Sequence, residues 1–195
     1  MDRKASVSRK TKETQIEVNL NLDGTGRCDI STGIPFFDHM LTAFSVHGFF
    51  DLKIIAKGDL DVDYHHTIED VGLVLGQALS KTLENKHRII RFGDSCVPMD
   101  EALSRVTIDL SNRPYLVYHF PDKLKVKGQF DTHLAREFFQ AFCIQGAFNL
   151  HINTCYGTNE HHVLESIFKA FGKALSMATR INDKISGALS SKGTL

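Results

Sequence analysis

Two copies of the pattern His-His-x-x-Glu occur in the sequence, in DYHHTIEDVG (63–72) and in NEHHVLESIF (159–168). Imidazole nitrogens and carboxylate oxygens together bind divalent transition metals such as manganese, iron or zinc. On a helix, positions four apart share one face, whereas adjacent positions point about 100° apart. His65 and Glu69 can therefore converge on one ion while His66 points toward another. The second copy repeats this arrangement with His161, His162 and Glu165.

Each half of the chain also carries one lone histidine ahead of its motif, His39 in FFDHMLTAF and His133 in FDTHLAREF. Each ion would then have three imidazole ligands and one carboxylate ligand. They would come from a lone histidine, from a His–Glu pair, and from the second histidine of the other copy's pair. Such mixed ligation leaves positions open for water or substrate, which is typical of a catalytic metal rather than a closed structural zinc site. A histidine pair at a helix start more often serves as a polar cap, but its repetition in register favours metal binding.

The histidine motifs lie inside a longer internal repeat. HHTIEDVGLVLGQAL (65–79) aligns without gaps with HHVLESIFKAFGKAL (161–175), and HGFFDLKI (47–54) resembles QGAFNLHI (145–152). Upstream of these segments, alternating apolar residues predict a strand in each half, and DGTG (23–26) predicts a hairpin that turns the first of them back. Helices are expected from each lone histidine and from each histidine pair, where apolar residues recur at helical spacing.

This order predicts an α+β fold. We expect a tandem duplication of a split β-α-β half, with two sheets sandwiching a helical layer around a pseudo-two-fold axis. The segment near 85–100 breaks the pattern with Gly and Pro and marks the boundary. Residues 1–92 are expected to form the first half-repeat with an N-terminal arm. Residues 93–195 are expected to form the second with a C-terminal substrate-binding tail, and the two halves are expected to make one compact unit.

The overall composition excludes several classes of protein. The 23 Lys and Arg residues balance 23 Asp and Glu residues, so the chain lacks the basic surface of a nucleic-acid binder. No apolar run is long enough for a membrane span or a signal peptide. The four cysteines show no Cys-x-x-Cys spacing, which favours reduced thiols. We therefore expect a cytoplasmic protein that binds neither nucleic acid nor membrane.

The sequence resembles the imidazoleglycerol-phosphate dehydratase family in its monofunctional form. Besides the two histidine motifs, the segments that carry this resemblance are FFDHML, SNRPYL, DTHLAREFFQAF and SSKG. The resemblance covers nearly the whole chain. It implies a hydro-lyase of histidine biosynthesis that dehydrates imidazole glycerol phosphate to imidazole acetol phosphate through a metal-bound imidazolate. It also implies two Mn²⁺ ions per active site, with other divalent transition metals possible. The family assembles as homo-oligomers, 24-mers built from trimers, with active sites between subunits.

The same resemblance implies roles for individual residues. The metal ligands would be His39, His65, His66, Glu69, His133, His161, His162 and Glu165. Catalytic roles would fall to Glu13, Glu69 and Glu165, with Glu13 as the acid/base. The phosphorylated imidazole substrate would contact Glu13, His39, His47, His65, Glu69, Arg91, Arg113, His161, Lys169, Ser191 and Lys192. Arginine binds phosphate with bidentate geometry and lysine as a point charge, so we expect the tail to order over the bound phosphate.

Three other classes of protein also use such donors. A dinuclear metallohydrolase would use the same ions to activate water and would release phosphate instead of forming a ketone. A ferritin-type storage shell uses Glu-x-x-His on four long helices, which reverses the order found here, and the expected strands disfavour it. A metal-stabilised structural protein would have no need for Arg91, Arg113 and Lys192.

Overall fold

The computed structural model describes residues 3–83, 86–121, 124 and 130–193. The first half contains β1 (Lys4–Lys10), β2 (Thr14–Asn21), β3 (Cys28–Ser31), α1 (Pro35–Gly48), β4 (Asp51–Gly58) and α2 (His65–Thr82). The second half repeats this order with β5 (Phe92–Met99), β6 (Ala102–Asp109), β7 (Tyr115–His119), α3 (Thr132–Gly146), β8 (Asn149–Tyr156) and α4 (Glu160–Thr179).

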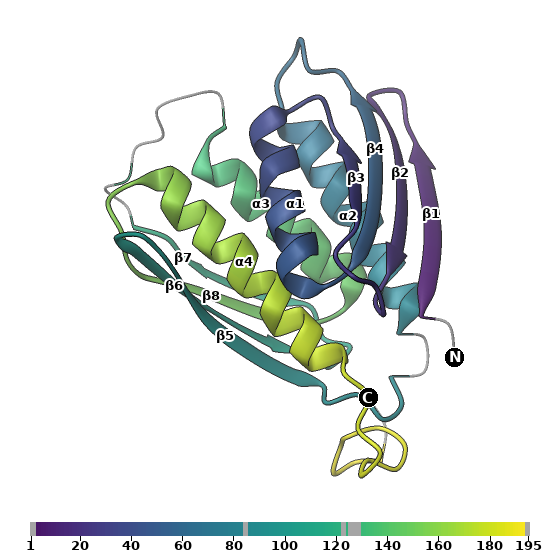
Figure 1. Cartoon of the computed structure of the whole chain (residues 1–195). Coiled ribbons are helices and arrows are strands. Elements are labelled where there is room, and N and C mark those ends of the chain that lie inside the picture. Colours follow the sequence, from purple (N-terminus) through teal and green to yellow (C-terminus); the bar gives the residue numbers. More distant parts are fainter. Residues whose placement is uncertain (1–2, 84–85, 122–123, 125–129, 194–195) are drawn as a thin grey trace.

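Each half forms a four-stranded sheet, and the helices lie between the two sheets (Figure 1). The strand orders are β1-β2-β4-β3 and β5-β6-β8-β7. In both sheets the strand that precedes the first helix of its half pairs in parallel with its neighbour, and the other pairs are antiparallel. The predicted fold class, an α+β duplicated half with two sheets around a helical layer, is therefore confirmed.

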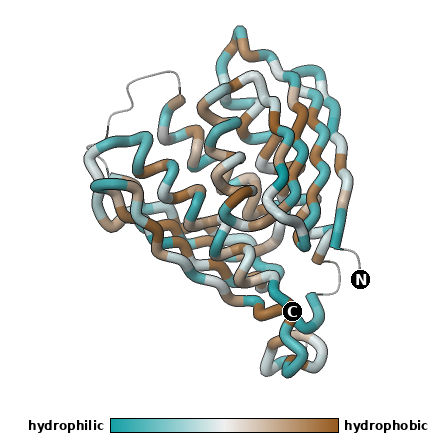
Figure 2. Tube along the Cα trace, viewed as in Figure 1, coloured by the Kyte–Doolittle hydropathy of each residue, from teal (hydrophilic) through white to brown (hydrophobic). Residues whose placement is uncertain are grey.

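The alternation of apolar residues in the strands and their helical spacing in the helices both direct apolar side chains toward the helical layer. Hydrophobic residues concentrate there (Figure 2). On β2, Ile16, Val18 and Leu20 are buried while the residues between them are exposed or half-buried. The helices of the two halves meet through phenylalanine rings, such as Phe44 and Phe171, whose centroids lie 5.0 Å apart. The two halves thus share one aromatic core.

Glycines allow the helices of one half to cross closely over those of the other. A Cβ added to Gly172 of α4 would lie 2.3 Å from the carbonyl oxygen of Phe44 on α1. A Cβ added to Gly76 of α2 would lie 2.8 Å from the carbonyl oxygen of Phe142 on α3. Phe44 and Phe142 are therefore equivalent positions, 98 residues apart, and each half packs its second helix on the first helix of the other.

One local prediction was wrong. DGTG (23–26) does not close a hairpin, because the strand that follows it, β3, pairs in parallel with β4 instead of folding back on β2. The hairpin partner of β2 is β1, which lies in the segment read as an N-terminal arm. The segment 85–100, where we expect the boundary between the halves, contains the first strand of the second half, β5, at the edge of the second sheet.

None of the helices in the described part of the chain combines the length and apolarity needed to cross a lipid bilayer.

Candidate active site

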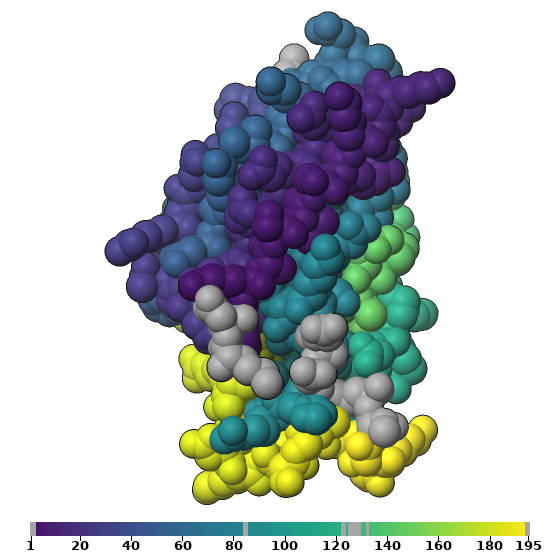
Figure 3. Space-filling model, turned by 90° about the vertical axis from the view of Figure 1, so that its right-hand side faces the viewer, coloured from purple at the N-terminus to yellow at the C-terminus, as the bar shows by residue number. Residues whose placement is uncertain are grey.

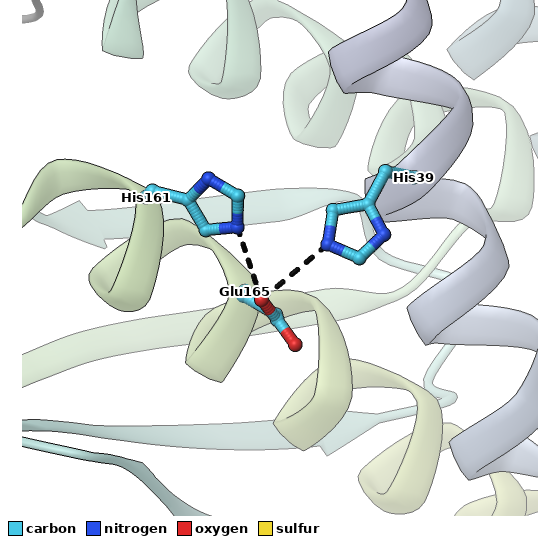
Figure 4. Close-up of side chains that lie close together, drawn as sticks. All are labelled: His39, His161 and Glu165. Carbon is cyan, nitrogen blue, oxygen red and sulfur yellow. Dashed lines mark hydrogen bonds and ion pairs between the residues drawn. The ribbon is translucent and has the colours of Figure 1, made fainter.

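His39 of α1 and His161 and Glu165 of α4 converge on one point (Figure 4). Nε2 of His161 lies 3.1 Å from Oε2 of Glu165, and Nε2 of His39 lies 3.4 Å from the same oxygen. The ligand atoms of the three residues all lie within 4.8 Å of one another. Two imidazole nitrogens and a carboxylate oxygen at this spacing fit a divalent transition metal ion.

The cluster joins the two halves because of how α4 begins and where it crosses α1. The side chain of Asn159 caps α4 by accepting a hydrogen bond of 2.9 Å from the backbone N–H of His161. His161 and Glu165 are four residues apart and therefore share a helix face. The close crossing at Gly172 brings α1, and with it His39, beside that face.

Lys169 of α4 and His47 of α1 extend this cluster along the two crossing helices. Nζ of Lys169 lies 2.6 Å from Oε1 of Glu165, so the second carboxylate oxygen is already paired. Burial alone would raise the pKa of Glu165, but the hydrogen bond and charge of Lys169, together with His39, lower it below its ordinary value. Burial and the nearby lysines lower the pKa of His47. The carboxylate of Glu165 is therefore ionised at neutral pH and available as a ligand.

The structure does not assemble a second cluster of this kind within the described residues. Nε2 of His65 lies 3.6 Å from Glu69, and Nε2 of His133 lies 3.4 Å from Glu137 instead of joining that pair. The 98-residue equivalence of α1 and α3 makes Glu137 the counterpart of His39 and places His133 about one helical turn earlier. In one chain, His65 and Glu69 are thus half-buried and His133 is exposed, and the described residues bring none of them into a group of three ligands.

The second histidine of each pair points to a carboxylate that sequence reasoning missed. Nδ1 of His66 lies 3.0 Å from Asp59, and Nδ1 of His162 lies 2.7 Å from Glu101. Each hydrogen bond raises the pKa of its histidine. The pKa of Glu101 falls to about 2, first because of His162 and then because of backbone N–H donors. Carboxylates commonly hold the outer nitrogen of a metal-ligating histidine in this way.

Glu13 lies at the tip of the β1–β2 hairpin, next to the first histidine motif. Oγ1 of Thr11 fixes the turn by accepting hydrogen bonds from the backbone N–H groups of Glu13 and Thr14, at 3.1 and 2.9 Å. The strand ends next to this turn are tied to α2, because buried Asp70 accepts hydrogen bonds from Arg9 and Thr14. Within the described residues, the Glu13 carboxylate has no hydrogen bond or ion pair and is exposed.

Arg91 and Arg113, the predicted phosphate ligands, meet at Asp109, which the sequence did not single out. Nε and Nη2 of Arg91 donate to Asp109 at 2.6 and 3.0 Å, and Nη1 donates to the carbonyl of Leu189 at 2.8 Å. Nη2 of Arg113 lies 3.9 Å from the same carboxylate. A guanidinium has five N–H groups, so Arg91 keeps two for an anion.

The C-terminal tail packs against Arg91 and the segment just before it. Backbone hydrogen bonds of 2.7 Å join Arg88 to Gly187 and Asn182 to Arg88, and the tail gathers at one end of the molecule (Figure 3). A hollow of about 550 Å³ lies there, lined by Arg91, Ser191 and neighbouring tail residues. The backbone N–H of Lys192 donates to Oγ of Ser190 at 3.2 Å, and its side chain is exposed.

The two groups of predicted site residues lie at opposite ends of α4. His161 is in the first turn, whereas the backbone N–H of Arg91 donates to the carbonyl of Ala178 near the last residue, Thr179. At a rise of 1.5 Å per residue, the stretch from His161 to Ala178 spans about 25 Å. The substrate that the family resemblance implies has three carbons between ring and phosphate, so it would be too short to touch both groups in one chain.

Comparison with known proteins agrees with these features. The family model described as imidazoleglycerol-phosphate dehydratase matches residues 32–175. The imidazoleglycerol-phosphate dehydratase of Syntrophobacter fumaroxidans is 55% identical over 193 residues, covering 99% of this chain and 98% of that protein. The enzyme of the same name from Acetivibrio thermocellus is 54% identical over 195 residues, covering 100% of both chains.

Two crystal structures of such dehydratases also superpose well. The one from Staphylococcus aureus has a TM-score of 0.82 at 38% identity and covers 92% of this chain and 99% of its own. The one from Pyrococcus furiosus, in complex with (S)-C348, has a TM-score of 0.84 at 35% identity and covers 97% of this chain and 100% of its own. The chain therefore belongs to the imidazoleglycerol-phosphate dehydratase family, the hydro-lyases of histidine biosynthesis.

Proposed function

We propose that this chain is a metal-dependent dehydratase that converts imidazole glycerol phosphate to imidazole acetol phosphate with a pair of divalent ions, Mn²⁺ being the first to test. The observation that supports metal dependence best is the convergence of His39, His161 and Glu165 from the two halves. When bound, the ion would act as a Lewis acid that makes the substrate imidazole easier to deprotonate. The other ligands would be His65, His66, Glu69, His133 and His162.

The reaction removes a hydroxyl from the carbon beside the ring and a proton from the next carbon, and the resulting enol becomes a ketone. We propose that Glu13 removes this proton. Its carboxylate is exposed and unpaired within the described residues, and Thr11 fixes the turn that carries it. A carboxylate that is not engaged elsewhere can accept a proton and return it to the carbon beside the ring. Glu69 and Glu165 would act by holding the ions.

The substrate phosphate would bind at the other end of the chain. Arg91 retains two N–H groups there, Arg113 is exposed beside it, and the tail brings Ser191 to the same hollow. The exposed ammonium of Lys192 would add a point charge. His47 and Lys169 lie instead beside Glu165, where they would contact the reacting part of the substrate.

The separation of about 25 Å along α4 supports an active site shared between chains. One copy would contribute the histidine cluster and another the arginines and tail. The metal-ligand candidates His65, Glu69 and His133 would likewise find their missing partners in a neighbouring copy. We propose a homo-oligomer of the family's kind, in which a single isolated chain is inactive.

The test is an assay of the metal-free protein, prepared with a chelator and reconstituted with Mn²⁺. We expect ketone formation from imidazole glycerol phosphate only after reconstitution, with no release of inorganic phosphate. His161→Ala should abolish it, whereas His151→Ala, an exposed histidine on β8, should retain it. Phosphate release without ketone would favour the metallohydrolase alternative, and undiminished activity without metal would refute the proposal.

A further inference from the structure

The two halves hold their outer histidines with carboxylates from different places in the fold. Asp59, which contacts His66, follows the last residue of β4. Glu101, which contacts His162, lies in the turn between β5 and β6. In a strict duplication, the two carboxylates would occupy equivalent positions.

The close contacts of two glycines identify the residue of the second half that is equivalent to Asp59. A Cβ on Gly58 would collide with Thr67 of α2, and a Cβ on Gly157 would collide with Val163 of α4. Thr67 and Val163 each follow the histidine pair directly, so Gly58 and Gly157 are equivalent. The residue after each glycine is Asp59 in the first half and Thr158 in the second.

Strand register identifies the residue of the first half that is equivalent to Glu101. Val18 faces Ile54 in one sheet and Val106 faces Ile152 in the other. Because Ile54 and Ile152 are equivalent, so are the two valines, and counting back five residues from each reaches Glu13 and Glu101. Each glutamate is the residue immediately before its strand, β2 or β6.

The second half therefore uses the counterpart of Glu13 to orient its histidine. The backbone N–H groups of Thr158 and Asn159 donate to Oε1 of Glu101 at 3.2 and 2.8 Å, and Oε2 accepts from His162. In the first half Asp59 takes this task. Glu13 is left without a hydrogen bond or ion pair in the described part of the chain.

We propose that Asp59 and Glu101 are positioning residues with one shared task, and that Asp59 leaves Glu13 free for proton transfer. By accepting a hydrogen bond from Nδ1–H, each carboxylate fixes the tautomer of its histidine and leaves Nε2 as the ligand atom. Oδ2 of Asp100 lies 3.8 Å from Nε2 of His162, too far to hydrogen-bond that atom. This inference rests on the proposed function for the role of Glu13, but the orientation of the histidines does not require it.

The test is a double-mutant cycle on the metal-free protein, titrated with Mn²⁺ by calorimetry in the absence of substrate. Asp59→Ala should weaken Mn²⁺ binding about 10- to 100-fold, and Asp59→Asn less, because an amide oxygen still accepts from Nδ1–H. Once His66 is replaced by Ala, removal of Asp59 should cost nothing further. Asp61→Ala, an exposed carboxylate two residues away, is the matched control and should bind Mn²⁺ like the wild type.

Wild-type affinity in Asp59→Ala, or an equal loss with and without His66, would overturn the positioning role while leaving the dehydratase activity intact. The matched pair Glu13→Ala and Glu101→Ala tests the division of labour. Glu13→Ala should lower kcat with Mn²⁺ affinity unchanged, whereas Glu101→Ala should lower Mn²⁺ affinity. The reverse pattern would overturn the second part of the proposal, and a wild-type protein that binds Mn²⁺ without forming ketone would refute the proposed function alone.

Discussion

The crossing of α4 over α1 predicts that Gly172→Ala destabilises the protein, although alanine normally favours a helix. The new Cβ would lie 2.3 Å from the carbonyl oxygen of Phe44, so the two helices must separate by about 1 Å to restore van der Waals contact. Alanine gains about 1 kcal/mol of helix propensity over glycine. Overpacking against backbone costs about 1–3 kcal/mol, and for so close an approach we expect about 2–3 kcal/mol, which leaves a net loss of about 1–2 kcal/mol.

The measurement is urea unfolding of the metal-free protein, with Gly76→Ala as the matched variant at the other crossing. Its Cβ would lie 2.8 Å from the nearest atoms, so its loss should be smaller. A shift of α1 would also move His39 away from Glu165, and Mn²⁺ affinity should fall in Gly172→Ala because metal sites tolerate displacements of only about 0.2 Å. If Gly172→Ala were as stable as the wild type, or more stable than Gly76→Ala, the close crossing would not be rigid.

Three further predictions concern charged residues. Burial lowers the pKa of Lys86 to about 8 from 10.5, so between these pH values the unfolded chain binds more protons and the folded state gains stability as pH rises. The stability of Lys86→Met relative to the wild type should therefore fall by up to about 3 kcal/mol over that window in unfolding titrations. Asp70→Ala leaves the Arg9 guanidinium without its carboxylate and should cost about 2 kcal/mol in urea unfolding; a loss under about 0.5 kcal/mol would contradict this. Lys192→Ala should raise KM about 10- to 100-fold with metal content intact, and an unchanged KM would contradict its phosphate role.

The sequence predicts those elements best in which a local pattern reflects burial on one face. The alternation of Ile16, Val18 and Leu20 predicted β2, and the repeated apolar spacing predicted α2 and α4. In the edge strands β1 and β5 only Val7 and Gly93 are buried, so KASVSRK and FGDSCVPM lack a clear alternation of apolar residues. The pairing of β3 depends on β4, which lies far along the chain, and no local turn signal reveals it.

The candidate site follows the same division between local and distant information. The spacing of His161 and Glu165 is a property of one helix and was visible in the sequence. His39 lies beside Glu165 only because α1 crosses α4, and the contacts of Asp59, Glu101 and Asp109 depend on strand register. Once the repeat is aligned through paired strands, however, Glu13 and Glu101 become counterparts, which the histidine motifs alone do not show.

The crossed packing of the four helices has a consequence for how the chain can be divided. Because α2 rests on α3 and α4 rests on α1, neither half alone covers the apolar helix faces that meet the other half. A polypeptide that ended after the first half would leave phenylalanines such as Phe44 in water and would gain stability by pairing with a second copy of itself. Mixing separately produced halves should accordingly regenerate the intact core, with each fragment acting as the folding template of the other.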